Sequence, residues 1–346
     1  EIASCLVGSE MCIRDSPKSI DLIRDSTPLP RWMTMCTYSL WWILIQRDWY
    51  LYQGNLDYLK EQKSYLCDLL QLIMTRIGED GLEKFNDDEG RFLDWPSCEN
   101  PLAINAGVQA LVIQAMKAGY ELCSVLGEDM LATKCEAVRR KMVNAAPKII
   151  KPFLKSGMAP DAPGQKQAAS LLALTGLISP KEANQKYLSV NGGHGFSTFY
   201  GYYMLQAMAA AGNYQGAIDV IRQYWGAMID LGATTFWEDF NLDWLPDASR
   251  IDELVATGKK DIHRDYGDHC YKGFRHSLCH GWSSGPTSWL SEHVLGVQVV
   301  EPGCRVVRIT PHLGDLEWVE GTFPTPYGQI VIRHEKGADA KVRSRI

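Results

Sequence analysis

The sequence predicts a mainly helical protein that ends in a small antiparallel β-structure. Between Thr37 and Ile229 the apolar residues recur at helical spacing, in paired segments separated by Gly, Pro, Asp or Asn. From Cys304 onward apolar and polar residues alternate, as in half-buried strands. Wholly apolar helices also alternate with amphipathic ones, which favours a closed double ring of helical hairpins. An open α-solenoid is the alternative architecture.

The first predicted hairpin illustrates this alternation. Residues 38–51 are apolar nearly all round, which is typical of an inner helix that is buried on every side. Residues 59–77 carry a single apolar stripe over charged positions, as expected of an outer helix. The stripe consists of Leu66, Leu69, Leu70 and Ile73.

Further hairpins and strands follow in order. The expected helices cover residues 102–125 with 130–146, 166–174 with 180–188, and 198–211 with 214–230. A loop-rich stretch then occupies residues 234–285, and such a long irregular segment usually serves a functional site. Pro286 begins one more helix, expected at residues 287–295. The expected strands cover residues 304–313, 315–323 and 329–335, with a turn through residues 324–328.

The composition excludes some partners. A formal net charge of -6 provides no basic field for phosphate backbones, so nucleic acid is not an expected partner. The longest apolar run, residues 38–45, is far shorter than the roughly 20 residues of a membrane span, so no membrane insertion is expected. The 11 Trp and 15 Tyr residues suit sugar binding, because aromatic faces pack on the C–H faces of sugar rings as well as in cores.

The ten cysteines are scattered without a CxxC motif, and most are expected to be free, buried thiols. The densest polar cluster has a spacing that matches none of the usual zinc patterns, so we predict no metal site. This cluster comprises His269, Cys270, His276, Cys279 and His280.

The first 16 residues have no signal-peptide layout. Residues 6–16 resemble translated sequencing-adaptor readthrough. We therefore expect residues 1–16 to be non-native and the true upstream region to be lost, in which case the missing signal says nothing about secretion.

Three loops place polar and aromatic residues between hydrophobic helices, at residues 91–95, 232–240 and 276–282. In a ring of hairpins such connections emerge at one end, so we expect these loops to converge on one cavity. In the middle loop Glu238 lies between Trp237 and Asp239, where aromatic surroundings and a second carboxylate would raise its pKa toward that of a working base.

Each of these loops also has a structural interpretation. Glu238 could be a surface residue that caps a turn. Asp94 could be an N-cap or turn residue beside a buried Trp95. His276 and His280 are more often hydrogen-bonded structural histidines than catalytic ones.

The order of these motifs resembles glycoside hydrolase family seventy-eight, the inverting α-L-rhamnosidases. The resemblance begins near Thr37 and continues to the C-terminus. It rests on GATTFWE at residues 232–238, SLCHGWSSG at 277–285, LDW at 93–95, FYGYY at 199–203, LGV at 295–297 and EPG at 301–303.

The resemblance implies a partial (α/α)6 barrel followed by a C-terminal antiparallel β-sandwich portion. The barrel, the catalytic domain, would occupy residues 17–300 and be incomplete at its N-terminus, and the partial β-domain would occupy residues 301–346. Bacterial enzymes of this family often act outside the cytoplasm, which favours a periplasmic or secreted location for the full-length protein and leaves the compartment open.

The resemblance also implies roles for single residues. Glu238 would be the general base, and His280 would bind sugar hydroxyls. Trp95 would form an apolar wall for the ring and its 6-methyl group, with Asp94 beside it as a hydroxyl acceptor. Trp237 and Trp282 complete the expected substrate-binding set. The expected partner is a rhamnose-containing glycan or glycoside, and no cofactor is implied because carboxylates carry both catalytic roles.

The general acid of the family has no convincing match between Ser16 and Met35. We expect it upstream of this chain, which would then bind sugar but hydrolyse little. The alternatives are another inverting glycosidase on the same barrel and a non-catalytic carbohydrate-binding or α-solenoid protein.

Overall fold

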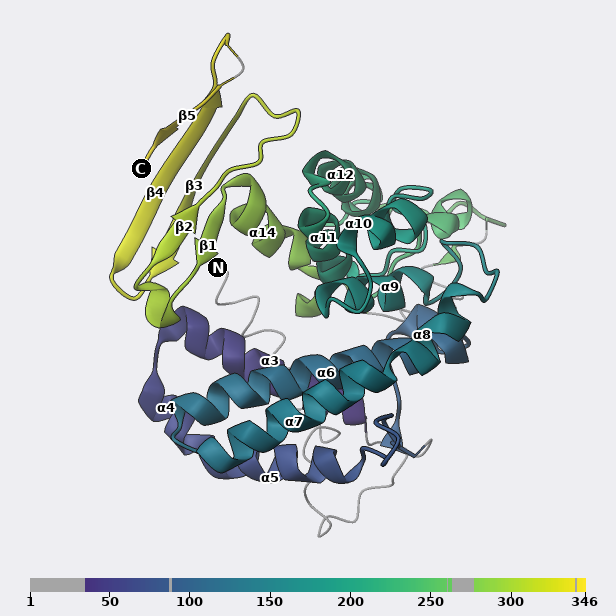
Figure 1. Ribbon diagram of the computed structural model, residues 1–346. Coiled ribbons are helices and arrows are strands. Elements are labelled where there is room, and N and C mark those ends of the chain that lie inside the picture. The colour runs from purple at the N-terminus through teal and green to yellow at the C-terminus, as the bar shows by residue number, and fades with distance from the viewer. Residues whose placement is uncertain (1–34, 87–88, 260, 263–276, 340) are drawn as a thin grey trace.

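The computed structural model describes residues 35–86, 89–259, 261–262, 277–339 and 341–346 (Figure 1). The first helices are α3 (Cys36–Gln53), α4 (Leu56–Glu61), α5 (Lys63–Thr75), α6 (Pro101–Val125), α7 (Asp129–Ala145) and α8 (Pro147–Leu154). There follow α9 (Gln165–Leu174), α10 (Pro180–Ala183), α11 (Gly201–Ala210), α12 (Tyr214–Asp230) and α14 (Gly285–Trp289). Two of the helices continue as π-helical turns, η4 (Asn184–Leu188) after α10 and η7 (Leu290–Val294) after α14.

The helices form an inner and an outer layer, as the alternating pattern predicted. In the inner layer α3 packs on α6, α6 on α9, α9 on α11, and α11 on α14. Helix α6 buries side chains around most of its circumference, whereas α5 buries only the predicted stripe of Leu66, Leu69, Leu70 and Ile73. The mainly helical architecture is thus confirmed, and the closure of the inner layer into a six-hairpin barrel stays a prediction.

The ends of the inner helices are set by local signals. Asn100 caps α6 by accepting a hydrogen bond from the backbone N–H of Ala103, and Pro101 occupies the first turn. Gly54 ends α3 with a φ of 64°, a conformation that favours glycine. A Cβ at Gly54 would lie 2.7 Å from the Cα of Gly303, so the close packing of α3 on the short 3-10 turn η8 (Pro302–Cys304) requires glycine there.

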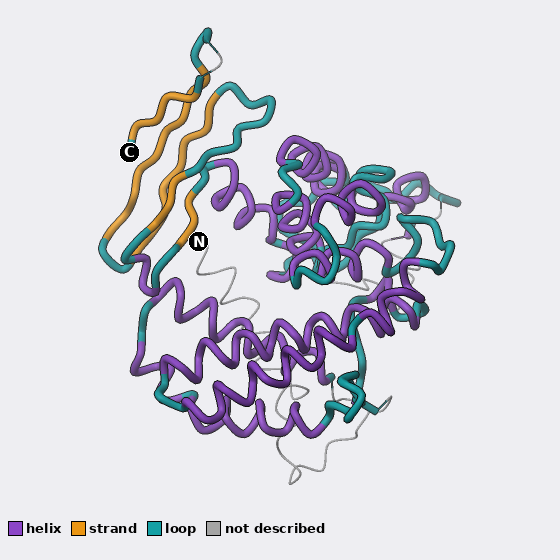
Figure 2. Tube along the Cα trace, in the orientation of Figure 1, coloured by secondary structure: helices purple, strands orange, loops and turns teal. Residues whose placement is uncertain are grey.

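The strands gather at one side of the molecule (Figure 2). β1 (Val297–Val299) pairs with β2 (Val307–Ile309), and β3 (Trp318–Thr325), β4 (Gly328–Lys336) and β5 (Val342–Arg345) form a second antiparallel sheet. A small core joins Phe323 and Ile332 to Leu295 and Val297. This confirms the antiparallel C-terminal region, while the sandwich stays a prediction. The sequence had not predicted β1 or β5.

The long connection between α12 and α14 contains two short 3-10 segments among its described residues, η5 (Leu242–Asp247) and η6 (Gly281–Ser283). Another 3-10 turn, η3 (Trp95–Ser97), precedes α6. None of the helices in the described part of the chain is both long enough and apolar enough to span a membrane.

Candidate functional site

The three predicted loops meet at the end of the inner layer where the helices begin. The Thr37 hydroxyl at the start of α3 donates to the carbonyl of Phe92. Ser197, four residues before α11, donates to the carboxylate of Asp94, and the Thr198 hydroxyl donates to the carbonyl of Glu238. These contacts, with those between Glu238 and the loop of Ser277 and Trp282, link the three loops to one another, and their convergence on one cavity stays a prediction.

Asp94 is the cap of the 3-10 turn η3. Its carboxylate accepts hydrogen bonds from the backbone N–H of Trp95 at 2.9 Å and from the hydroxyl of Ser197, and the Gln167 amide lies 3.5 Å away. The side-chain hydroxyl of Ser97 accepts from the backbone N–H of Asp94, which completes a capping box. Burial, with a smaller contribution from the charge of Asp239, raises the pKa of Asp94 to about 7, and the hydrogen bonds from Ser197 and Trp95 oppose this shift.

The predicted role of Asp94 as an acceptor for a sugar hydroxyl disagrees with this geometry. Only 1% of the residue is exposed, and its carboxylate faces protein donors. The N-cap interpretation describes the structure better. Trp95 itself is half-buried and packs edge to face on Phe92 with ring centroids 5.0 Å apart, and its role as a wall for the sugar stays a prediction.

Glu238 is held by the facing loop on both its main chain and its side chain. Its backbone N–H donates to the carbonyl of Ser277 at 2.8 Å, and its Oε2 accepts from the backbone N–H of Ser277 at 2.8 Å. Its carbonyl accepts from the Trp282 indole N–H at 2.6 Å as well as from Thr198. The residue is half-buried, so this side chain is both fixed and accessible.

Trp237 does not have the accessibility that substrate binding requires. It is 0% exposed and packs edge to face against Phe240, with ring centroids 6.0 Å apart. Its predicted sugar contact is therefore replaced by a packing role, because no face of the indole reaches solvent in this structure. A large apolar residue next to a candidate catalytic residue can stabilise the loop by packing beneath it in the core, without contacting a ligand.

His280 lies beside Glu238 and is half-buried. Its Nδ1 accepts from the backbone N–H of Trp282 at 3.4 Å, which assigns the proton of the neutral ring to Nε2. Burial lowers the pKa of His280, and the charge of Glu238 opposes this shift. A neutral imidazole with its Nε2–H available as a donor fits hydrogen bonding to a hydroxyl.

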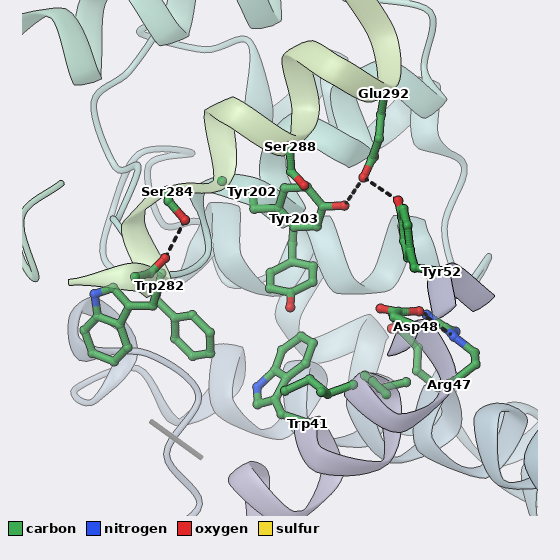
Figure 3. Close-up of a pocket in the computed structure, with 16 residues that line it drawn as sticks. Trp41, Arg47, Asp48, Tyr52, Tyr202, Tyr203, Trp282, Ser284, Ser288 and Glu292 are labelled. Carbon is green, nitrogen blue, oxygen red and sulfur yellow. Dashed lines mark hydrogen bonds and ion pairs between the residues drawn. The ribbon is translucent and has the colours of Figure 1, made fainter. Parts of the chain in front are cut away.

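Trp282 joins these residues to a cavity of about 130 Å³ between α3, α11 and α14 (Figure 3). Trp282 stacks on Phe199 with ring centroids 5.1 Å apart and planes 10° apart. Trp41 and Tyr203 also line the cavity and stack on each other at 4.5 Å. The sequence had predicted a general aromatic character but had not assigned Trp41 or Phe199 to a site, because aromatic residues in apolar helices are usually core residues.

Glu292 of η7 lies in the same cavity, where it joins three helical elements (Figure 3). Its carboxylate accepts from the hydroxyls of Tyr202 at 2.9 Å and Tyr52 at 3.4 Å, and from the amide of Gln206. Burial raises the pKa of Glu292 to about 7. Tyr52 belongs to the last turn of α3, so this carboxylate lies toward the end of the inner layer away from Asp94.

The predicted polar cluster at residues 269–280 includes two residues within the described part of the chain. His269, Cys270 and His276 lie outside the described residues, whereas Cys279 is exposed and His280 contacts Trp282. Within the described part of the chain, no group of three or more His, Cys, Asp or Glu side chains could hold a metal ion.

Comparison with known proteins adds a family match at the C-terminus. Residues 296–346 match the family described as the bacterial alpha-L-rhamnosidase C-terminal domain. Among curated proteins, no sequence match is found. The described fold is thus that of a mainly helical unit with an antiparallel β-region that carries this match.

Solved structures of rhamnosidases are similar in fold to most of this chain. A family seventy-eight rhamnosidase of Bacillus sp. GL1 is 22% identical with a TM-score of 0.70, and the match covers 97% of this chain and 35% of that one. A Dictyoglomus thermophilum α-L-rhamnosidase is 19% identical with a TM-score of 0.67, covering 97% and 38%. The Streptomyces avermitilis α-L-rhamnosidase complexed with L-rhamnose is 18% identical with a TM-score of 0.63, covering 86% and 27%.

These findings confirm the resemblance to glycoside hydrolase family seventy-eight. The chain spans about a third of the length of the three solved structures above.

Proposed function

We propose that the chain carries the general-base side of an inverting glycoside hydrolase that releases terminal α-L-rhamnose from glycosides or polysaccharides. The observation that carries this proposal is the grouping of Glu238, His280 and Trp282 on two loops that are hydrogen-bonded to each other. A carboxylate, a neutral imidazole and an indole together suit a sugar that has both hydroxyls and an apolar methyl group.

In the proposed reaction Glu238 removes a proton from the attacking water. The N–H of Ser277 holds Oε2, so the carboxylate has a defined orientation and Oε1 is the oxygen assigned to the water. His280 donates from Nε2 to a sugar hydroxyl, since its Nδ1 is engaged by the backbone of Trp282. Trp95 and Trp282 provide apolar surface for the ring and the 6-methyl group.

Inversion requires a second carboxyl group as general acid on the opposite face of the sugar, roughly 6.5 to 9.5 Å from the base. We assign this acid to sequence upstream of the residues described here, and we propose that the helical region, residues 17–300, contributes to an (α/α)6 barrel. Residues 301–346 would form part of a β-sandwich domain. The assignment of residues 1–16 as non-native is likewise a proposal.

The substrate assignment is supported by the similar structures. The Streptomyces avermitilis enzyme is described in complex with L-rhamnose, and the rhamnosidase from Klebsiella oxytoca with rhamnose bound. Rhamnose is therefore the first sugar to test. Binding by this chain and hydrolysis by a longer polypeptide are separate measurements, because the base and the acid are assigned to different stretches of sequence.

The decisive experiment is hydrolysis of an aryl α-L-rhamnoside by the polypeptide extended at its N-terminus with its genomic upstream sequence. Glu238→Gln should lower kcat by about 100-fold to 10,000-fold, because general base catalysis contributes a factor of this size. The exposed Glu79→Gln is the matched control and should retain full activity. NMR of the first-formed sugar should show an anomeric configuration opposite to that of the substrate.

The proposal is wrong if Glu238→Gln is as active as the wild type. Retention of configuration would instead contradict the inverting mechanism and leave a glycosidase of another mechanistic class. Circular dichroism and the thermal midpoint of both variants identify a loss of activity that is due only to unfolding.

A further inference from the structure

Two neighbouring hydroxyl residues, Ser197 and Thr198, link the loops of the candidate site, and the sequence had not predicted a role for either. Both residues lie in the turn that leads into α11 through Phe199 and Tyr200, and both are buried, at 2% and 3% exposure. Their hydroxyls point to different loops: Ser197 donates to the carboxylate of Asp94, whereas Thr198 donates to the carbonyl of Glu238. One short segment therefore contacts both the loop that holds Trp95 and the loop that holds the predicted base.

This segment is itself rigidly held. The carbonyl of Ser197 accepts from the backbone N–H of Gly201 at 2.9 Å, which ties it to the first turn of α11. Helix α11 packs on α9 and α14, and the buried Gln167 of α9 lies with its amide 3.3 Å from the Ser197 hydroxyl. The two hydroxyls thus extend from a fixed part of the inner layer rather than from a surface loop.

The carbonyl of Glu238 receives donors from two directions. The Thr198 hydroxyl reaches it from the turn before α11, and the Trp282 indole reaches it from the loop that carries His280. These contacts restrain the main chain of Glu238, while the N–H of Ser277 restrains its side chain. A carbonyl that loses one of its two donors is held less firmly in its orientation, and small displacements of a catalytic group are costly.

We propose that Ser197 and Thr198 are positioning residues that couple the Asp94–Trp95 turn to Glu238 and so set the geometry of the sugar site. In this arrangement Asp94 acts through Ser197, and its carboxylate holds the turn and the bridge in place. The inference rests on the proposed function for its sugar-binding consequence, whereas the coupling of the two loops is a property of the sugar-free protein.

The first test measures amide hydrogen exchange of residues 235–240 in the sugar-free chain. Thr198→Val removes the hydroxyl at nearly constant volume and should raise exchange in this segment about fivefold, the factor that corresponds to one ordinary hydrogen bond. Thr198→Ser keeps the donor and should restore wild-type exchange. The matched control is Thr175→Val, which removes a half-buried hydroxyl that bonds only within its own helix end.

The coupling is tested with Ser197→Ala. If the two hydroxyls act as one bridge, this variant raises exchange at residues 94–98 and also at residues 235–240. Faster exchange confined to residues 94–98 would overturn the coupling, and unchanged exchange at residues 235–240 in Thr198→Val would overturn the positioning role.

The second test measures L-rhamnose affinity by tryptophan fluorescence. Thr198→Val should raise Kd about fivefold or more at a temperature where unfolding curves show both proteins to be fully folded, and Thr198→Ser should restore wild-type affinity. A Kd that stays at the wild-type value in Thr198→Val overturns the inference while leaving the proposed function intact. If the wild-type chain binds no L-rhamnose, the proposed sugar site is wrong, and the exchange measurements still decide whether the bridge exists.

Discussion

Asp94 and Glu292 are two carboxyl groups of the inner layer with raised pKa values, and they differ in what their neighbours do. Asp94 accepts hydrogen bonds from Trp95 and Ser197, which belong to the loops of the candidate site. Glu292 accepts them from Tyr52 and Tyr202, which belong to α3 and α11. Burial raises both pKa values to about 7. Two carboxyl groups with similarly raised pKa values thus have different structural roles: Asp94 holds loops in position, and Glu292 holds helices together.

The largest expected effect is on the pH dependence of stability. The pKa of Glu292 is raised from 4.5 to about 7 on folding, so the protonated carboxyl stabilises the fold at low pH. This contribution is complete below pH 4.5 and is lost as the pH rises through 7. At 1.36 kcal/mol per pKa unit the loss is about 3 kcal/mol, and it is about 4 kcal/mol for Asp94, whose pKa is raised from 3.8 to about 7.

Urea unfolding at pH 5 and pH 8 measures this prediction. Glu292→Gln and Asp94→Asn stay neutral throughout, so each variant should gain stability relative to the wild type as the pH rises from 5 to 8. A variant whose difference from the wild type is the same at both pH values would show that its carboxyl group is not buried as described.

The next effect distinguishes the two carboxyl groups by function. Asp94→Ala removes the acceptor for Ser197 and for the N–H of Trp95 and should weaken L-rhamnose binding about tenfold, since a displaced site residue commonly costs 1 to 2 kcal/mol. Glu292→Gln should leave Kd within about twofold, because its partners hold helices together. Titration calorimetry checks both. Equal losses of affinity would mean that the two ends of the layer are not functionally distinct.

The smallest effect concerns the link between α3 and η7. Tyr52→Phe removes the hydroxyl that donates to Glu292 at 3.4 Å and should reduce the free energy of unfolding by about 1 kcal/mol. Tyr50→Phe, on the same helix, is the control for the loss of a tyrosine hydroxyl. Thermal unfolding of the two variants at pH 6 gives the difference. A thermal midpoint equal to that of the wild type for Tyr52→Phe would show that this hydrogen bond does not contribute to stability.

Local signals in the sequence were sufficient for most of the elements. The stripe of Leu66, Leu69, Leu70 and Ile73 appears as the buried face of α5, and Pro286 occupies the first turn of α14 as predicted. Both features depend on residues within a few positions of one another. β5 was missed because VRSR has no apolar alternation, and its strand conformation comes from pairing with β4.

Hydrophobic periodicity also did not predict which segments are π-helical rather than α-helical. The expected helix at residues 287–295 is divided into α14 and the π-helical η7, and the expected helix at residues 180–188 ends in the π-helical η4. An apolar pattern indicates which side of a helix is buried, but a single extra residue per turn is decided by the packing around it.

The sequence by itself therefore determined the order of inner and outer helices, the switch to strands, and the three loops that carry the candidate site. The tertiary structure alone decided how their side chains are used. It turned Asp94 inward to Ser197, 103 residues away, buried Trp237 completely, and placed the Thr198 hydroxyl on Glu238, 40 residues away. Such contacts depend on how helices distant in sequence pack together, whereas hydrophobic periodicity reports only which face of each helix is buried.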